Sequence, residues 1–260
     1  MATPNDQSIS LNKFISSTGV CSRREADRMI EEARVTLNGE IAQKGNRVMP
    51  GDKVLVDGKP LKAKPKAIYL AFNKPVGIVC TTDQREPKNI ISYINYPQRL
   101  FPIGRLDKPS EGLIFLTNDG DIVNKILRAG NQHEKEYIVT VDRPINKRFV
   151  QRMSSGIPIL GTVTKKCLVE QVGKATFRIV LVQGLNRQIR RMCEYLDYRV
   201  LKLKRVRIMN VDLGELQKGK WRELTAQEIQ AINKMVRHSS KTAEPSKPKK
   251  ASRSSRKKPR

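Results

Sequence analysis

Two segments of this 260-residue chain combine residue types that suit acid–base or nucleophilic chemistry. In the first, residues 101–120 (FPIGRLDKPSEGLIFLTNDG), Asp107 stands in a basic cluster directly before an apolar run. A loop carboxylate that is braced by a rigid strand is well placed for catalysis. In the second, residues 184–198 (GLNRQIRRMCEYLDY), a glycine-bearing turn leads into a predicted helix. The first two turns of that helix carry three arginines, Arg187, Arg190 and Arg191.

Together the two segments predict a site built on a carboxylate and an arginine. An opposite charge within hydrogen-bond reach favours the ionised form of a carboxylate. The same residues allow other interpretations. Asp107 by itself also fits a carboxylate that caps a turn, and the stretch from Arg187 to Arg207, with eight basic and two acidic residues, also suits phosphate binding.

The charge of the chain points to nucleic acid as a partner. The net charge is +26, and the last 22 residues (239–260) contribute +8, so the remainder still carries +18. A folded body this basic binds polyanions by releasing their counterions. A membrane surface fits less well, because the sequence has no apolar run of transmembrane length and no basic amphipathic helix with an aromatic face.

Several other classes lack their sequence signals. The N-terminus has no basic start followed by an apolar stretch, so we expect a cytoplasmic protein. No GxGxxG loop or GxSxG elbow is present, which argues against an RNA methyltransferase and a serine hydrolase. We expect no metal site, because no CxxC pair occurs and only two histidines accompany four scattered cysteines: Cys21, Cys80, Cys167 and Cys193.

Residues 9–62 are predicted to form a small domain of two helices followed by short strands. Ser22 and Glu25 predict a capping box at the start of the second helix. The apolar stripe of that helix is predicted to be Ala26, Met29, Ile30 and Ala33. Tight hairpin turns are predicted at Asn38-Gly39 and Asp57-Gly58.

After a Lys/Pro-rich linker (63–67), residues 68–236 are predicted to form a larger α+β domain. Its strand-like runs (IYLAFNKP, YIVTV, FRIVLV, VRIMNVDL) alternate irregularly with helical ones, which favours a mainly antiparallel mixed sheet. The N-terminal residues 1–8 and the basic tail 237–260 are expected to be flexible, because neither has an apolar periodicity.

The small domain resembles the S4-like RNA-binding domains, on the strength of LNKFIS, SRREADRMIEEARVTLNG and PGDKVLV. The resemblance implies that three arginines of the second helix contact RNA, near backbone N–H groups that also favour phosphate. An alternative is that they only form a solvated face paired with neighbouring carboxylates, since the net charge of residues 10–62 is just +3. The three are Arg23, Arg24 and Arg28.

The large domain resembles the pseudouridine synthases that modify ribosomal RNA. The resemblance rests on GRLDK and NRQIRRM together with NKPVGIVCTT (73–82) and KEYIVTV (135–141). It implies an isomerase that converts uridine to pseudouridine in large-subunit ribosomal RNA without a cofactor, acting as a monomer. Transfer RNA stays open as a second substrate.

The same resemblance assigns site residues. Asp107 corresponds to the catalytic aspartate of GRLD, Arg190 to the basic residue that pairs with it, and Tyr137 to the tyrosine that stacks on the target base. Arg105 corresponds to the residue that fills the gap left by the flipped base. The other residues expected to contact RNA are Leu106, Lys108, Arg187, Gln188, Ile189 and Arg191.

Each role has an alternative. Arg190 also fits a phosphate contact, with Arg191 or Arg187 holding the carboxylate instead. Tyr137 also fits a core aromatic residue, and Arg105 a plain phosphate contact. A non-catalytic ribosome-associated RNA-binding protein is the competing function, and the intact GRLD and NRQIRR segments argue against it.

Overall fold

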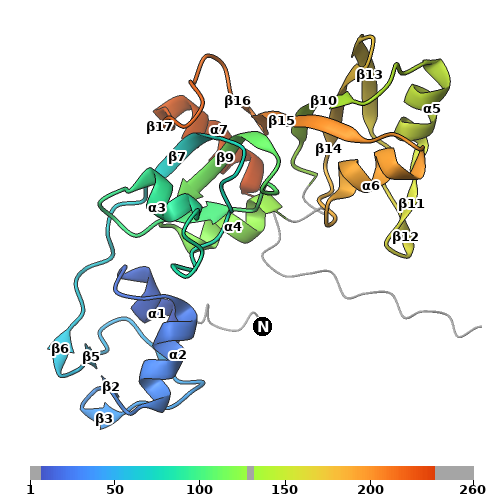
Figure 1. The fold of residues 1–260 in the computed structure, drawn as a ribbon. Coiled ribbons are helices and arrows are strands. Elements are labelled where there is room, and N and C mark those ends of the chain that lie inside the picture. Colours follow the sequence, from blue (N-terminus) through green and yellow to red (C-terminus); the bar gives the residue numbers. More distant parts are fainter. Residues whose placement is uncertain (1–6, 128–131, 238–260) are drawn as a thin grey trace, which may run out of the picture.

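In the computed structural model, residues 7–127 and 132–237 are described, and they form two domains (Figure 1). The N-terminal domain lies at one end, and the large domain extends away from it in two parts joined by long strands. The two ends that the sequence predicts to be flexible, residues 1–8 and 237–260, lie almost entirely outside the described residues.

The N-terminal domain packs two helices against short strands around one apolar cluster that includes Leu11, Ile15, Ala26 and Ile30. Its main sheet has the order β3-β2-β5-β6, and β1 pairs with β4. The elements are β1 Ile9–Ser10, α1 Leu11–Ser17, α2 Arg23–Glu31, β2 Val35–Leu37, β3 Glu40–Ile41, β4 Arg47–Val48, β5 Val54–Val56 and β6 Lys59–Pro60.

The predicted hairpin turns are present. Asn38 and Gly39 have φ values of 53° and 94°, and Asp57 and Gly58 have 49° and 72°, as a turn with two left-handed residues requires. Two details of α2 were predicted wrongly. The Ser22 side chain accepts from Glu25 N, but the Glu25 carboxylate pairs with Arg28 and does not complete a capping box. Ala33 is exposed because the helix ends at Glu31.

The large domain is built on one nine-stranded sheet whose main order is β13-β14-β10-β15-β9-β7-β17. All of these neighbours are antiparallel except β15 and β9, which confirms the α+β class with a mainly antiparallel mixed sheet. The strands are β7 Tyr69–Lys74, β8 Phe101–Ile103, β9 Glu111–Thr117, β10 Lys135–Val141, β11 Pro158–Ile159, β12 Thr162–Val163, β13 Leu168–Gly173, β14 Thr176–Leu181, β15 Val200–Ile208, β16 Val211–Asp212 and β17 Trp221–Glu223. The helices are α3 Ile90–Ile94, α4 Gly120–Leu127, α5 Lys147–Ser155, α6 Gln188–Tyr195 and α7 Ala226–Val236.

One predicted strand is in fact two. The run VRIMNVDL breaks at Met209, whose φ is 54°, so that β15 and β16 form a hairpin. The apolar residues of this run did not reveal that the chain reverses, because both strands of the hairpin pack on the same core. Ile208 contributes from one strand and Val211 from the other.

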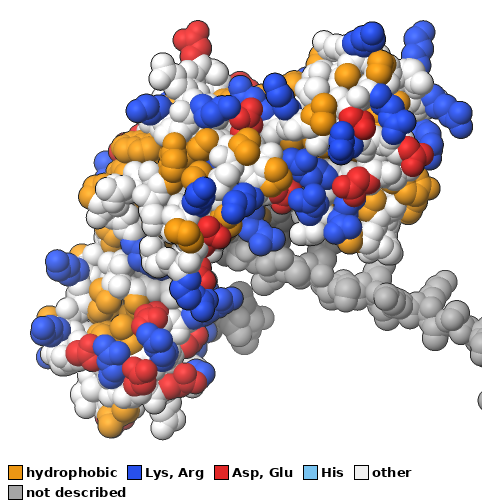
Figure 2. All heavy atoms as spheres, viewed as in Figure 1, with side chains coloured by type: hydrophobic (Ala, Val, Ile, Leu, Met, Phe, Trp, Pro, Cys, Tyr) orange, Lys and Arg blue, Asp and Glu red, His pale blue; other side chains and the backbone are white. Residues whose placement is uncertain are grey.

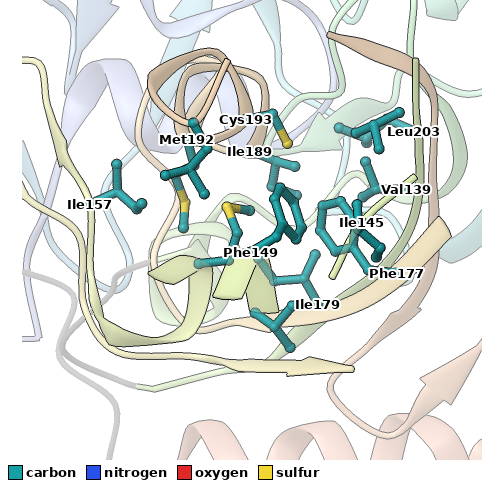
Figure 3. Packing of buried hydrophobic residues seen from close by; sticks show 14 of the residues in the cluster. Val139, Ile145, Phe149, Ile157, Phe177, Ile179, Ile189, Met192, Cys193 and Leu203 are labelled. Atoms are coloured by element: carbon teal, nitrogen blue, oxygen red, sulfur yellow. The ribbon is translucent and has the colours of Figure 1, made fainter. Parts of the chain in front are cut away.

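The two parts of the large domain have separate cores. In the part with β7 and β9, one cluster packs under α4 and α7, and another packs under α3 on the other face of the sheet. In the part with β13 and β14, α5 and α6 cover a single cluster, where Phe149, Phe177 and Met192 meet (Figure 3). The sheet is therefore covered on both faces at one end and on one main face at the other.

A narrow seam joins these two parts. The strands β15 and β9 run parallel over only two residue pairs, Lys204 with Glu111 and Arg205 with Gly112. A Cβ atom on Gly112 would lie 2.2 Å from the backbone oxygen of Arg205 and 2.7 Å from its nitrogen. The backbones can approach this closely only because residue 112 has no side chain.

The N-terminal domain is fixed to the large domain by polar contacts. Arg99 Nη1 donates to the backbone oxygen of Cys21 at 2.9 Å, and Lys13 Nζ lies 2.6 Å from Asp121. Asn118 holds the end of the linker, since its side chain donates to Lys66 O and accepts from Ile68 N, both at 2.9 Å.

We predict that Gly112→Ala destabilises the large domain strongly. The added Cβ meets backbone atoms that cannot rotate away, and φ at this position is +106°. We expect a loss of about 3 kcal/mol or more, and a fall in Tm of roughly 6 to 12 °C, measured by thermal unfolding. Gly161→Ala is the control, because Gly161 also has a positive φ (+71°) but its Cβ would meet nothing within 4 Å. Equal melting temperatures for the two variants would contradict the argument.

Candidate active site

A cavity of about 340 Å³ opens where the two parts of the large domain meet. Figure 2 shows Lys and Arg side chains gathered over this junction, with acidic side chains among them. The two motifs that sequence reasoning singled out, far apart in the chain, both line it. The lining residues are Gly104, Arg105, Leu106, Asp107, Ser110, Leu127, Lys135, Tyr137, Leu181, residues 183–190, Leu203 and Arg205.

Asp107 lies on the loop between β8 and β9, as the sequence predicted. The loop turns back on itself, with Ser110 N donating to Asp107 O at 2.9 Å, and β9 follows directly. Leu106 is buried in the core under α3, and its N–H points to Cys80 Sγ at 3.4 Å. The loop is therefore fastened on both sides of Asp107, whose side chain is 37% exposed.

Two arginines approach the Asp107 carboxylate. Arg190 Nε and Arg187 Nη1 each lie 3.9 Å from Oδ2. Arg187 is exposed and stands just before α6 with φ at 51°, so it is not in the first turn as predicted. Arg191 turns away from the cavity, and its Nε donates to Asn186 O at 3.1 Å.

Arg190 is held rigidly in the wall of the cavity. Its Nη2 donates to Ser110 Oγ at 3.1 Å and to Pro109 O at 3.2 Å, and its Nη1 donates to Val200 O at 3.3 Å. Its buried Nε has no hydrogen-bond partner and faces Asp107 at 3.9 Å. Burial, followed by the charge of Arg187, lowers the pKa of Arg190. The Nε–H is thus a fixed donor placed for a carboxylate or ligand atom.

Tyr137 lies on β10 and is half-buried. Its ring lines the cavity and also packs against two of the apolar clusters. The guanidinium carbon of Arg205 is 5.9 Å from the ring centroid, a cation–π distance. This position is compatible with both interpretations of Tyr137, as a core aromatic residue and as the ring that stacks on the target base. The side chain packs against core residues and also lines the cavity.

The remaining residues predicted for the large domain differ in where they lie relative to the cavity. Arg105 is exposed at the cavity, whereas Gln188 and Ile189 are buried in its wall. Gln188 Oε1 accepts from Leu185 N at 3.0 Å, which fixes the turn before α6. Lys108 is exposed and does not line the cavity, and its backbone oxygen accepts from Gly77 N at 2.8 Å.

The three arginines of α2 differ in their surroundings. All three are exposed, and Arg28 is paired with Glu25 and with Glu32. Neither Arg23 nor Arg24 forms an ion pair with any residue in the described part of the chain. The alternative that these arginines only form a solvated, ion-paired face therefore fits Arg28. The charges of Arg23 and Arg24 are not neutralised by a carboxylate of the described residues.

Sequence reasoning left several of the cavity residues unassigned, among them Ser110, Lys135 and Arg205. Ser110 and Lys135 stand within the quoted segments GRLDKPSEGL and KEYIVTV, so a signal for them was present. Arg205 had none, because the run LKLKRVRI gives no reason to prefer it over Lys202, Lys204 or Arg207.

Within the ranges 7–127 and 132–237, no group of three or more His, Cys, Asp or Glu side chains is arranged to hold a metal ion. None of the helices in these ranges has the length and apolar character needed to span a bilayer.

Comparison with known families and proteins finds relatives along most of the chain. A family model described as RNA pseudouridylate synthase matches residues 68–195, and an S4 domain model matches residues 10–54. The chain is 57% identical to the dual-specificity RNA pseudouridine synthase RluF of Escherichia coli (strain K12), over 92% of this chain and 83% of the relative. It is 31% identical to ribosomal large subunit pseudouridine synthase B of Bacillus subtilis (strain 168), over 88% and 97% respectively.

Two further comparisons agree with these. The chain is 38% identical to an uncharacterized RNA pseudouridine synthase of Aquifex aeolicus (strain VF5), over 88% of this chain and 95% of the relative. A crystal structure of a pseudouridylate synthase superposes with a TM-score of 0.64 at 29% identity, over 86% of this chain and 99% of the other.

We predict that Arg190 and Arg191 differ in their contribution to stability. Arg190→Ala leaves the Ser110 hydroxyl and two backbone carbonyls without their donor, which should lower the free energy of unfolding by about 2 to 4 kcal/mol. Arg191→Ala removes only contacts to Asn186 at the surface and should change it by less than about 0.5 kcal/mol. Denaturant unfolding measures both, and equal effects would show that the Arg190 network does not hold the cavity wall.

Proposed function

This chain belongs to the RNA pseudouridine synthases, and we propose that it isomerises a uridine of large-subunit ribosomal RNA with Asp107 as the catalytic carboxylate. The match to this family, whose members are RNA-modifying isomerases, confirms the resemblance found in the motifs of the large domain. The match to the S4 domain confirms the resemblance found in the small domain. The large-subunit substrate is supported by the name of the Bacillus relative. The word "dual-specificity" in the name of the Escherichia relative supports a second RNA, and we propose transfer RNA.

One observation carries the proposed mechanism: a loop carboxylate borders a cavity and faces two arginines at 3.9 Å. Pseudouridine formation breaks the bond between N1 of uracil and C1′, rotates the base and joins C5 to C1′. Atoms are conserved, so the reaction needs no cofactor. Asp107 acts either as the nucleophile at C1′ or as the base at C2′, and both roles use an ionised carboxylate.

Arg190 is the residue that positions and stabilises this carboxylate. Its guanidinium is fixed by three acceptors and its free Nε–H faces Asp107, so the pair tightens with a small shift when RNA binds. Catalytic hydrogen bonds are often long before the substrate is in place. Arg187, more exposed and at the same distance, is suited to bind the phosphate beside the target and then to close on Asp107.

The base enters the cavity by flipping out of its stack, which costs a few kcal/mol. The volume of about 340 Å³ falls at the small end of ligand pockets, about 300 to 1,000 Å³. Tyr137 stacks on the flipped uracil, and exposed Arg105 enters the gap that the base leaves. Leu106, Gln188 and Ile189 shape the buried wall of the cavity, while Lys108 and Arg191 contact phosphates outside it.

The N-terminal domain supplies a second contact with RNA. Arg23 and Arg24 stand in the first turn of α2, where free backbone N–H groups favour phosphate. We propose that these two bind RNA directly, with a smaller part for Arg28. We further propose that the enzyme acts as a monomer, and its ribosomal substrate supports action in the cytoplasm.

We predict that Asp107→Asn abolishes pseudouridine formation and leaves RNA affinity unchanged. The substitution keeps the shape of the side chain but removes its charge and basicity, and the single-turnover rate should fall by at least about 1,000-fold. Pseudouridine mapping in a ribosomal RNA fragment, with filter binding on the same RNA, measures both effects. Retention of a tenth of the wild-type rate would rule out Asp107 as the catalytic residue.

We predict that the paired loss of Arg23 and Arg24 weakens RNA binding more than the loss of Arg28. For each phosphate contact removed, the slope of log affinity against log salt should become shallower by about 0.7 to 0.9. Arg28→Ala should have a smaller effect, because Glu25 and Glu32 already neutralise that side chain. Slopes measured on one RNA decide this, and identical slopes for wild type and R23A/R24A would show that α2 does not touch that RNA.

A further inference from the structure

Two buried cations in the cavity are not used by the mechanism above: Lys135 and Arg205. They lie on the neighbouring strands β10 and β15, where Arg205 is directly opposite Tyr137. Lys135 is two residues before Tyr137, so all three side chains are on the same face of the sheet. These three side chains and Leu203 line the same side of the cavity. We call the part formed by Lys135 and Arg205 the cationic wall.

Neither cation has an acidic partner. Within the described residues, no carboxylate lies at ion-pair distance from Lys135 or Arg205. The nearby Glu134 and Glu136 are both paired with Arg207. The positive charge of this wall is therefore not neutralised by any carboxylate in the described part of the chain.

The hydrogen bonds of the two cations are also incomplete. Arg205 Nε donates to Leu113 O at 2.6 Å, but its Nη2 is buried without a partner. Lys135 Nζ donates to His133 O at 3.2 Å, one acceptor for a group with three donors. Burial, and then the charge of Arg205, lowers the pKa of Lys135 to about 8. Burying such a pair is costly, and an anionic or strongly polar ligand would offset this cost by accepting from the unused donors.

The reaction produces an anion at this place. When the bond between N1 and C1′ breaks, its electron pair stays with the uracil, and the negative charge spreads over N1, O2 and O4. The base then turns, an electron pair at C5 forms the bond to C1′, and the proton lost from C5 is balanced by one gained at N1. Between the two steps the detached base is held only by the cavity.

We propose that Lys135 and Arg205 bind the O2/O4 edge of the flipped uracil and stabilise the negative charge on the base while it is detached. The inference rests on the proposed function and adds two residues to it. Donors aimed at charge that develops during a reaction act strongly in a water-excluded site, because they need no reorganisation. Tyr137, stacked on the base, would place the uracil edge against the cationic wall.

Arg205 has a structural role as well, and this decides which variant carries the test. Its Nε fastens β15 to β9 beside the Gly112 seam. Arg205→Met is therefore expected to damage folding along with chemistry. Among the described residues, Lys135 Nζ has a hydrogen bond only to the backbone oxygen of His133, so Lys135→Met keeps the length of the side chain and removes its charge and donors.

The experiment compares full-length wild type, Lys135→Met and Lys135→Arg in single-turnover conversion, with enzyme in saturating excess over the RNA. We expect the rate of Lys135→Met to fall by about 100-fold, with RNA affinity and its salt dependence unchanged, and Lys135→Arg to recover most of the rate. Lys202→Met is the matched control, since it removes a charge from the exposed part of β15 and should leave the rate unaltered. Thermal unfolding of each protein shows whether the fold is intact.

A second substrate separates charge stabilisation from simple positioning. In RNA with 5-fluorouridine at the target, the fluorine withdraws electrons and makes the detached base a more stable anion. The rate deficit of Lys135→Met, measured as loss of 5-fluorouridine, should then be smaller than on uridine.

Three outcomes overturn the inference alone while wild type makes pseudouridine. These are a wild-type rate for Lys135→Met, a loss confined to RNA affinity, and an equal deficit on the two substrates. If wild type makes no pseudouridine in any ribosomal or transfer RNA, the proposed function fails and this inference fails with it.

Discussion

The site depends on the close contact of two parallel strands at Gly112. Only two residue pairs join β15 to β9, and the missing side chain at residue 112 lets the backbones meet. On one side of this seam stands the loop with Asp107, and on the other the strand with Arg205. Ser110, just before the seam, holds Arg190 at 3.1 Å, so the same short stretch sets the carboxylate and its partner. A small displacement here would separate residues that come from two different cores.

Around the seam, the protein places more positive charge than it neutralises. Asp107 faces two arginines, and the cationic wall adds Lys135 and Arg205 without carboxylates of their own. Burying cations in this way is costly for the protein by itself. RNA phosphates and an electron-rich uracil supply the missing negative charge, so the cavity is complementary to the substrate and, more strongly, to the detached base. Electrostatics that are unfavourable for folding thus become favourable for catalysis.

The sequence allowed a correct account of the architecture wherever local rules decide it. The Asn-Gly and Asp-Gly turns were predicted because a turn with two successive left-handed residues favours these residue types. The mixed sheet followed from the irregular order of strand-like and helical runs. The errors arose where a side chain had a choice of partner or where the hydrophobic pattern fitted two paths of the backbone. Glu25 pairs with Arg28 instead of capping α2, and the turn at Met209 is enforced by packing of both arms on one core.

The sequence by itself determined the family, through GRLDK and NRQIRRM, and with it Asp107, Arg190 and Tyr137 as candidate site residues. Only the tertiary structure decided their relations. It set Arg187 and Arg190 at equal distances from Asp107, turned Arg191 toward Asn186, and brought Lys135 and Arg205 into the same cavity. The reason is physical: motif spacing reports which residues are near in the chain. The direction of a side chain depends on strand register and on which buried acceptors are free, and these are fixed only when β9, β10, β15 and α6 pack together.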